Sequence, residues 1–182
     1  MKKGVRVPDT TWKVRTQNEE ENYGWADMTT EDVFAGKKVA VFSLPGAFTP
    51  TCSNTHLPEY EEAYVKLKSF VDEVYCISVN DAFVMNAWAK DLGVEKVKMI
   101  PDGTGAFTRN MGMLVEKPAQ GFGQRSWRYS MVCEDGVCTI FNEEAGRNDN
   151  SNDNDPLDVS DAGTLLKQLG DKSFLQDITS NN

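Results

Sequence analysis

Residues 45–52 read Pro-Gly-Ala-Phe-Thr-Pro-Thr-Cys and follow the apolar run 38–44, Lys-Val-Ala-Val-Phe-Ser-Leu. The apolar run is typical of a buried strand. Thr49 suits the N-cap of a helix, and Pro50 suits its first position, where a backbone N–H would have no partner. Cys52 then falls in the first helical turn, where free N–H groups and the helix dipole stabilise a thiolate. The stretch therefore predicts a strand, a loop and a helix that present Cys52 as a nucleophile.

The rest of the chain alternates strand and helix patterns, which favours an α/β fold with a parallel core. Asp135-Gly136 is a strong signal for a two-residue hairpin, so a pair of antiparallel strands is expected around it. Pro58 is expected to interrupt the helix that begins near Cys52. We predict a central mixed sheet flanked by helices, which is a thioredoxin-like fold. The expected strands are 38–43, 73–79, 97–100, 129–133 and 137–141, and the expected helices are 31–34 (capped by Thr30), 60–71, 83–92 and 164–169.

Size and composition are typical of one globular domain. The chain has 182 residues, of which 40% are hydrophobic and 26% are charged, so we expect residues 1–182 to form a single domain. Residues 1–24 are expected to be a peripheral extension with a hairpin, and residues 176–182 a frayed tail. The net charge of -9 argues against a nucleic-acid partner. Since no apolar run approaches a membrane span or a secretory leader, we expect a cytoplasmic protein without a membrane partner.

Residues 146–156 form an acidic, polar segment of low complexity, which predicts a solvated loop. The alternation of polar side chains over residues 149–153 superficially resembles a calcium loop. However, Asn154 stands where such a loop needs glycine, and Ser160 stands where it needs glutamate. We therefore expect no metal in this segment.

The residue three positions before Cys52 distinguishes between classes of thiol chemistry. A dithiol reductase would have a second cysteine there, whereas this chain has Thr49. A threonine forms no disulfide, but its hydroxyl both donates and accepts hydrogen bonds. This favours a site in which the thiolate attacks an O–O bond while the hydroxyl holds the peroxide.

The spacing Pro45-x-x-x-Thr49-x-x-Cys52 resembles the active-site motif of the peroxiredoxins, and the continuation Thr55-His56-Leu57-Pro58 resembles their type II or V (atypical) subfamily. The chain is similar to a stand-alone form of the peroxiredoxin domain of bacterial peroxiredoxin–glutaredoxin hybrids. The likeness covers about residues 25–169. Further segments that resemble the subfamily are 78–84, 101–107 and 128–130.

The resemblance implies a thiol peroxidase that reduces hydrogen peroxide and alkyl hydroperoxides through a sulfenic acid on Cys52. It also implies a homodimer, and it implies no metal, haem or nucleotide cofactor. Two alternatives stay open. One is a peroxide sensor or redox-relay protein that passes oxidation to a partner. The other, which Thr49 disfavours, is a thioredoxin-like dithiol reductase.

Three residues are expected to support Cys52. The resemblance assigns Arg128 as the arginine that stabilises the thiolate and the departing oxygen, with Arg125 as a rival three residues earlier. Pro45 is expected to shape the loop and shield the thiolate. His56 is the only histidine and lies four residues after Cys52. Because no third group is evident to orient it as a general base, a cysteine hydrolase is disfavoured, and we expect His56 to support the pocket.

The sequence offers one internal cysteine that could resolve the sulfenic acid. Cys76 matches a position at which plant-like members of the subfamily carry a cysteine. It lies in an apolar strand, where a buried small thiol is the default, and pairing with Cys52 would require local unfolding. An external thiol is therefore favoured as reductant. The candidates are glutathione, a glutaredoxin acting in trans, and thioredoxin.

The remaining two cysteines are placed by the expected hairpin. If Asp135-Gly136 forms a two-residue turn, Cys133 faces Cys138 as a close pair without ladder hydrogen bonds. A disulfide between them would be strained. In a reducing compartment we expect two free thiols on one apolar face.

Overall fold

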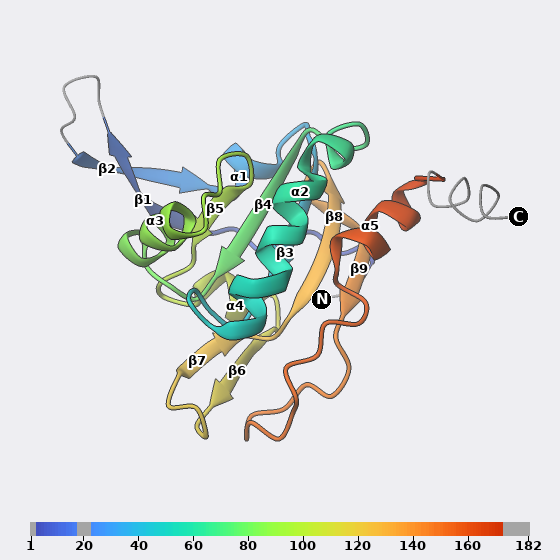
Figure 1. The fold of residues 1–182 in the computed structure, drawn as a ribbon. Coiled ribbons are helices and arrows are strands. Elements are labelled where there is room, and N and C mark those ends of the chain that lie inside the picture. Colours follow the sequence, from blue (N-terminus) through green and yellow to red (C-terminus); the bar gives the residue numbers. More distant parts are fainter. Residues whose placement is uncertain (1–2, 18–22, 173–182) are drawn as a thin grey trace, which may run out of the picture.

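The computed structural model describes residues 3–17 and 23–172 (Figure 1). The expected frayed tail, 176–182, lies outside the described residues. In chain order the elements are β1 (Thr11–Gln17), β2 (Tyr23–Thr29), α1 (Thr30–Phe34), β3 (Lys38–Ser43), the π-helical turn η1 (Cys52–His56), α2 (Leu57–Leu67), β4 (Glu73–Ser78), α3 (Ala82–Asp91), β5 (Lys98–Pro101), α4 (Ala106–Asn110), β6 (Leu114–Lys117), β7 (Gly123–Ser126), β8 (Tyr129–Glu134), β9 (Val137–Glu143) and α5 (Ala162–Leu169).

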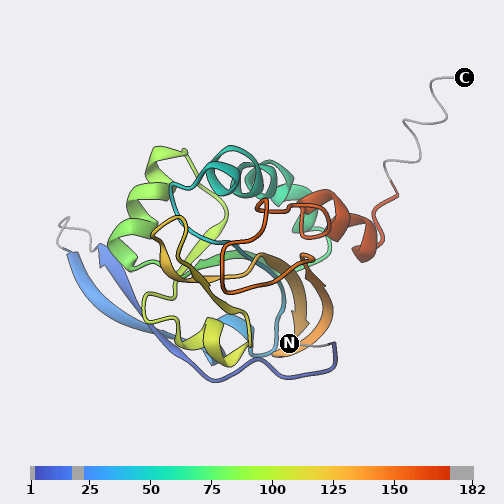
Figure 2. The ribbon, with the colours of Figure 1, turned by 90° about the horizontal axis from the view of Figure 1, so that it is seen from below.

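Five strands form the central sheet in the order β5-β4-β3-β8-β9. The middle strand, β3, pairs in parallel with β4 and antiparallel with β8. The outer strands continue this division, since β5 is parallel to β4 and β9 is antiparallel to β8. Helices α2, α3 and α5 lie over one face, and α1 and α4 lie over the other (Figure 2). The predicted mixed sheet flanked by helices is therefore confirmed.

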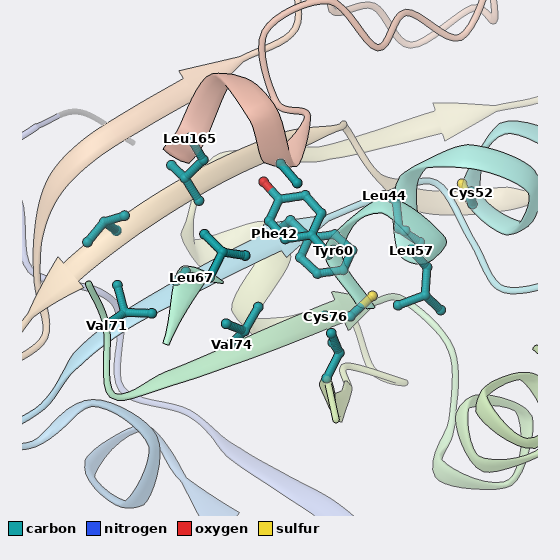
Figure 3. Close-up of a cluster of buried hydrophobic side chains, with 14 of the residues drawn as sticks. Phe42, Leu44, Cys52, Leu57, Tyr60, Leu67, Val71, Val74, Cys76 and Leu165 are labelled. Atoms are coloured by element: carbon teal, nitrogen blue, oxygen red, sulfur yellow. The ribbon is translucent and has the colours of Figure 1, made fainter. Parts of the chain in front are cut away.

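The sheet separates two hydrophobic cores. Successive residues of a strand point to opposite faces, so Phe42 of β3 enters the core beneath α2, α3 and α5, and Val41 enters the opposite core. In the first core Phe42 stacks on Tyr60 of α2 with ring centroids 3.8 Å apart. In the second core Trp12 of β1 packs edge-on against Phe107 of α4 at 5.2 Å. Cys52 belongs to the first core (Figure 3).

The N-terminal region forms the expected hairpin, because β1 and β2 pair antiparallel as a separate two-stranded sheet. Its base is part of the second core, where Val7 and Trp12 are buried. Before the hairpin, the N–H of Gly4 donates to the carbonyl of Cys138, and the N–H of Cys138 donates to the carbonyl of Val5. This segment therefore covers one end of β9, which is the edge strand of the central sheet.

The second hairpin has the predicted register. Cys133 pairs with Cys138, and Asp135 and Gly136 have φ angles of 48° and 74°, as a two-residue hairpin turn requires. Both cysteines are buried, and neither forms a disulfide in this structure. The prediction missed α4, β6 and β7, each of which has only four or five residues.

The predicted helices start one to three residues earlier than expected, and the largest difference is at α2, which begins at Leu57 and not at residue 60. The short helix α1 is capped by Thr29 and not by Thr30, because the Thr29 hydroxyl accepts the N–H of Asp32 while the Asp32 carboxylate accepts the N–H of Thr29. The last helix begins at Ala162, two residues earlier than expected, with Asp161 as its N-cap. Within the described residues, no helix has both the length and the apolar character needed to cross a membrane.

Candidate active site

The loop that leads from β3 to Cys52 is held in an unusual conformation. Phe48 has a φ of 62°, which is rare for a bulky residue. Arg125 packs against the loop, donating from Nε to the carbonyl of Phe122 and from Nη1 to the carbonyl of Pro45 at 3.4 Å. A Cβ at Gly46 would lie 2.3 Å from Nη1 of Arg125, so only glycine fits there without displacing the arginine. Arg125 therefore fixes the backbone of the loop.

Thr49 is turned toward this loop. Its hydroxyl donates to the carbonyl of Gly46 at 2.7 Å instead of capping the helix, so the N-cap prediction for its side chain is wrong. The helical conformation begins at Pro50, and the N–H of Ser53 donates to the carbonyl of Thr49. Because the hydroxyl proton is used by Gly46, the Thr49 oxygen retains its capacity to accept a further hydrogen bond.

Cys52 lies in the first turn of the helix, as predicted, and is buried. The N–H of Leu57 donates to the carbonyl of Cys52, which closes the wide turn η1. Pro58 follows this turn at the start of α2 and does not interrupt the helix, so that prediction is wrong. The physical reason is that the helix widens at η1 just before Pro58, which accommodates the proline ring and its missing N–H without a break. Turns of this π type occur often at functional sites.

Arg128 directly precedes β8, and its neighbour Tyr129 pairs with Ser43, the last residue of β3. Since the two strands are antiparallel neighbours, the start of β8 lies beside the loop that follows β3. Nη2 of Arg128 donates to Sγ of Cys52 at 3.6 Å. The Arg128 side chain is buried, and its Nε–H has no partner among the described residues.

His56 is buried between two partners that fix its tautomer. Its Nδ1 accepts a hydrogen bond from Nη1 of Arg128 at 2.9 Å, so Nε2 carries the proton and donates to the carbonyl of Ser160 at 3.1 Å. Burial, with the charge of Arg128 as a second cause, lowers the pKa of His56 to about 3. His56 is therefore neutral at physiological pH and holds the guanidinium, as expected of a supporting residue.

Glu144 is a site residue that the sequence analysis missed. Its Oε1 accepts hydrogen bonds from the backbone N–H groups of residues 158–160 and from the Ser160 hydroxyl, at 2.7 to 3.0 Å. Burial opposes its ionisation, but these bonds outweigh it and lower the pKa of Glu144. The turn that it holds presents the Ser160 carbonyl to both His56 and Tyr60. Nothing in the sequence distinguishes Glu144 from its acidic neighbours.

Asp155 was also missed. Its carboxylate forms an ion pair with Nη2 of Arg128 at 2.5 Å. It belongs to the acidic segment, which was predicted to be solvated, and that prediction is wrong for part of the segment. Asp153 pairs with Lys117 of β6 at 2.6 Å, with 6% and 4% of their side chains exposed. The segment thus runs beside β6 and β7 and reaches the active-site arginine (Figures 1 and 2).

Polar side chains of the acidic segment bind backbone groups of the neighbouring loop and strand. Asp149 accepts the N–H of Glu116, and Ser151 accepts the N–H of Ala119. Within the described residues no group of three or more His, Cys, Asp or Glu side chains could hold a metal ion. These side chains bind the protein itself.

A cavity of about 260 Å³ adjoins the loop and the first helical residues that precede Cys52. Pro45, Thr49 and Thr51 line one side, and Phe122 and Asp155 line another. The structure therefore brings Cys52, Arg128 and His56 into contact, with Thr49 and Pro45 at an adjoining cavity.

Cys76 lies in the same core as Cys52 but on a different element. Figure 3 shows it on β4, among the buried side chains beneath α2. Burial raises the pKa of the Cys76 thiol well above its ordinary value. The folded state thus keeps Cys76 as a protonated, unreactive thiol.

Comparisons with known proteins show the family to which the chain is similar. The family described as Redoxin matches residues 2–166. A peroxiredoxin of Synechocystis sp., sll1621, is 52% identical over 169 residues, which are 90% of this chain and 89% of the relative. The hybrid peroxiredoxin hyPrx5 of Haemophilus influenzae is 47% identical over 181 residues, which are 97% of this chain and 70% of the relative.

A solved structure gives the same result for the fold. The crystal structure of reduced Prx3 from Vibrio vulnificus in complex with hydrogen peroxide superposes with a TM-score of 0.81 and 38% sequence identity. The match covers 93% of this chain and 99% of that one.

Proposed function

This chain belongs to the peroxiredoxin family, and from that premise we propose that it reduces hydrogen peroxide and small alkyl hydroperoxides through a sulfenic acid on Cys52. Family membership supports thiol-dependent reduction of peroxides. The residue roles, the intermediate and the reductant are our proposal. We also propose, on the resemblance alone, that it acts as a cytoplasmic homodimer. Light scattering that gives the mass of one chain would contradict the dimer.

In the proposed reaction the Cys52 thiolate attacks the terminal peroxide oxygen. An S–O bond forms, the O–O bond breaks, and the departing oxygen takes a proton to leave as water or alcohol. Thr49 accepts a hydrogen bond from the peroxide O–H, because its own proton is already given to Gly46. Arg128 stabilises the charge that develops on the departing oxygen. Pro45 forms part of the wall of the adjoining cavity.

One observation carries the proposal: a buried guanidinium lies 3.6 Å from a buried thiol and still has a free donor. Buried N–H groups are nearly always paired, so the unpartnered Nε–H of Arg128 marks a position that a substrate oxygen would fill. His56 fixes the guanidinium from the other side. These contacts support a site built for an incoming oxygen rather than for a second sulfur.

We propose that an external thiol recycles the sulfenic acid. The thiol attacks the sulfenic sulfur, releases water and forms a mixed disulfide, which a second thiol then reduces. Cys76 is buried within β4, and Cys133 and Cys138 lie in the core on the opposite face of the sheet. Glutathione and glutaredoxin are the favoured reductants, by resemblance to the hybrid proteins, and thioredoxin is a further candidate.

The test is the intact mass of the reduced protein after one equivalent of hydrogen peroxide, for the wild type, Cys52→Ser and Cys76→Ser. We expect the gain of one oxygen in the wild type and in Cys76→Ser, and no change in Cys52→Ser. Loss of two hydrogens in the wild type would contradict the external reductant, and no change in any protein would contradict the peroxidase.

Turnover with glutathione, with and without glutaredoxin, completes the test. Steady peroxide consumption is the expected result. Thioredoxin is assayed in the same way, and rapid oxidation of Cys52 without turnover by any of the three reductants would support a peroxide sensor that passes oxidation to a partner.

A further inference from the structure

The segment that carries Asp155 is fixed at a point close to the active site. The buried pair Lys117–Asp153 attaches it to β6. The second carboxylate oxygen of Asp153 accepts the N–H of Asp155 at 3.0 Å. Asp155 itself has a φ of 52°, a left-handed conformation that Asp and Asn adopt more readily than most residues. Its carboxylate is thus held toward Arg128 by the backbone.

Asp155 accepts a hydrogen bond from Nη2 of Arg128, a group that would otherwise attract anions. A buried arginine beside a cavity is a strong site for carboxylates and other planar anions. Here Nη1 is occupied by His56 and Nη2 is shared between Cys52 and Asp155. Two N–H groups remain, the Nε–H and the second N–H of Nη1, but both paired edges of a guanidinium include Nη2, so binding of an anion by two adjacent N–H groups is blocked.

The same carboxylate faces the cavity. Asp155 lines it, and 35% of its side chain is exposed. Of the charged groups that line the cavity, Lys117 and Asp153 neutralise each other. Behind them, Asp155 offsets the charge of Arg128, His56 is neutral, and the charge of Arg125, which donates to the Pro45 carbonyl, acts on Cys52. An approaching substrate therefore meets the Asp155 carboxylate at the cavity, where the other charged lining groups neutralise each other.

We propose that Asp155 is a specificity-determining residue that selects neutral hydroperoxides against anionic ones. The inference rests on the proposed peroxidase function. Asp155 cancels the attraction of Arg128 for an anion while leaving the Nε–H for a neutral peroxide oxygen. Hydrogen peroxide and alkyl hydroperoxides pass this selection, whereas hydroperoxides with a nearby carboxylate are repelled.

The test compares a short-chain hydroperoxide that bears a carboxylate with its methyl ester, which differs only in charge. The ratio of kcat/KM for acid over ester is measured for the wild type, Asp155→Asn and Asp158→Asn. Asp155→Asn keeps the shape and backbone preference of the residue and removes its charge. Asp158→Asn removes the same charge three residues further along the chain, at an exposed position.

We expect Asp155→Asn to raise the acid-over-ester ratio by about 10-fold, as the loss of one nearby charge predicts. Asp158→Asn leaves the ratio near that of the wild type. Equal changes for both substrates in Asp155→Asn would overturn the inference and leave Asp155 a purely structural residue. Failure of the wild type to reduce either substrate, or hydrogen peroxide, would instead overturn the proposed function.

Ionic strength gives a second measurement that needs no folded variant. Added salt screens charge repulsion, so in the wild type it should accelerate the acid and leave the ester unchanged. An acid rate that is unaffected or slowed by salt would also overturn the inference. Urea unfolding midpoints of the two variants show whether either loses stability.

Discussion

Nδ1 of His56 accepts a hydrogen bond from Nη1 of Arg128, and the two side chains hold one another in the core beside Cys52. The bond requires a neutral imidazole, because a protonated ring has no free acceptor. The Ser160 carbonyl, which Glu144 positions, orients the ring from its far side. The position of the Arg128 charge beside the Cys52 thiol thus depends on contacts that begin at Glu144, directly after β9.

Replacing Arg128 by Lys should lower the rate constant for peroxide reduction by about 100-fold or more, as loss of an oriented donor typically does. An ammonium is a point charge and cannot reach His56, Cys52 and Asp155 at once with the geometry of a guanidinium. Stopped-flow oxidation of the reduced protein measures the effect. A variant that retains wild-type rates would show that Arg128 has no part in the reaction.

Replacing Thr49 by Val should reduce kcat/KM for hydrogen peroxide by about 100-fold, whereas Thr49→Ser should retain most of it. Valine preserves the shape of the side chain but loses the oxygen that accepts from the peroxide. Steady-state assays with a saturating thiol reductant compare the pair. Equal losses in the two variants would indicate that packing, and not the hydroxyl, matters.

The stability of the protein should fall as the pH is lowered below about 6.5, in part because of His56. The pKa of the folded-state imidazole is lowered to about 3, so protonation near pH 6.5 occurs only in the unfolded chain. The stabilisation is complete above pH 6.5 and is lost as the pH falls toward 3. Between pH 7 and 5 this contribution is about 2 kcal/mol.

Urea unfolding at the two pH values, for the wild type and His56→Gln, measures this contribution. The variant has no imidazole to protonate, so its stability should change less with pH. An equal pH dependence in both proteins would contradict the assignment of a neutral, buried His56.

Replacing Glu144 by Ala should destabilise the protein by about 2 to 3 kcal/mol, because several buried donors lose their acceptor. It should also slow peroxide reduction, since Ser160 no longer orients His56. Glu143→Ala is the matched control, because Glu143 pairs only with the partly exposed Arg147 in a surface ion pair. Similar unfolding midpoints for the two variants would exclude a special role for Glu144.

The central strands and the hairpin register could be predicted because they rest on strong local signals. The apolar run before the Cys52 loop and the Asp135-Gly136 turn each specify one backbone arrangement. Strands β6 and β7 lack such signals, since each has four residues and together they include Gly123 and three charged side chains that break the apolar pattern.

The site was predictable only in its local part. Cys52 and His56 are neighbours on one helix, so their proximity follows from spacing. Arg128 comes close to Cys52 because β3 and β8 are adjacent strands. The resemblance to the family predicted this proximity, whereas the spacing of the two residues in the sequence did not. Asp155 was missed because composition describes a segment's average tendency, whereas its role depends on single contacts with Lys117 and Arg128.

The wide turn η1 sets how the side chain of Cys52 is rotated relative to α2. Each residue of an α-helix advances the direction of its side chains by about 100°. Deleting one residue, such as Asn54, would therefore rotate Cys52 relative to the Tyr60 face of α2 by roughly a quarter of a turn. The turn sets the direction of the Cys52 side chain independently of the direction in which α2 packs its Tyr60 face on the core. Transplanting this cysteine into another protein would require the turn as well as the motif.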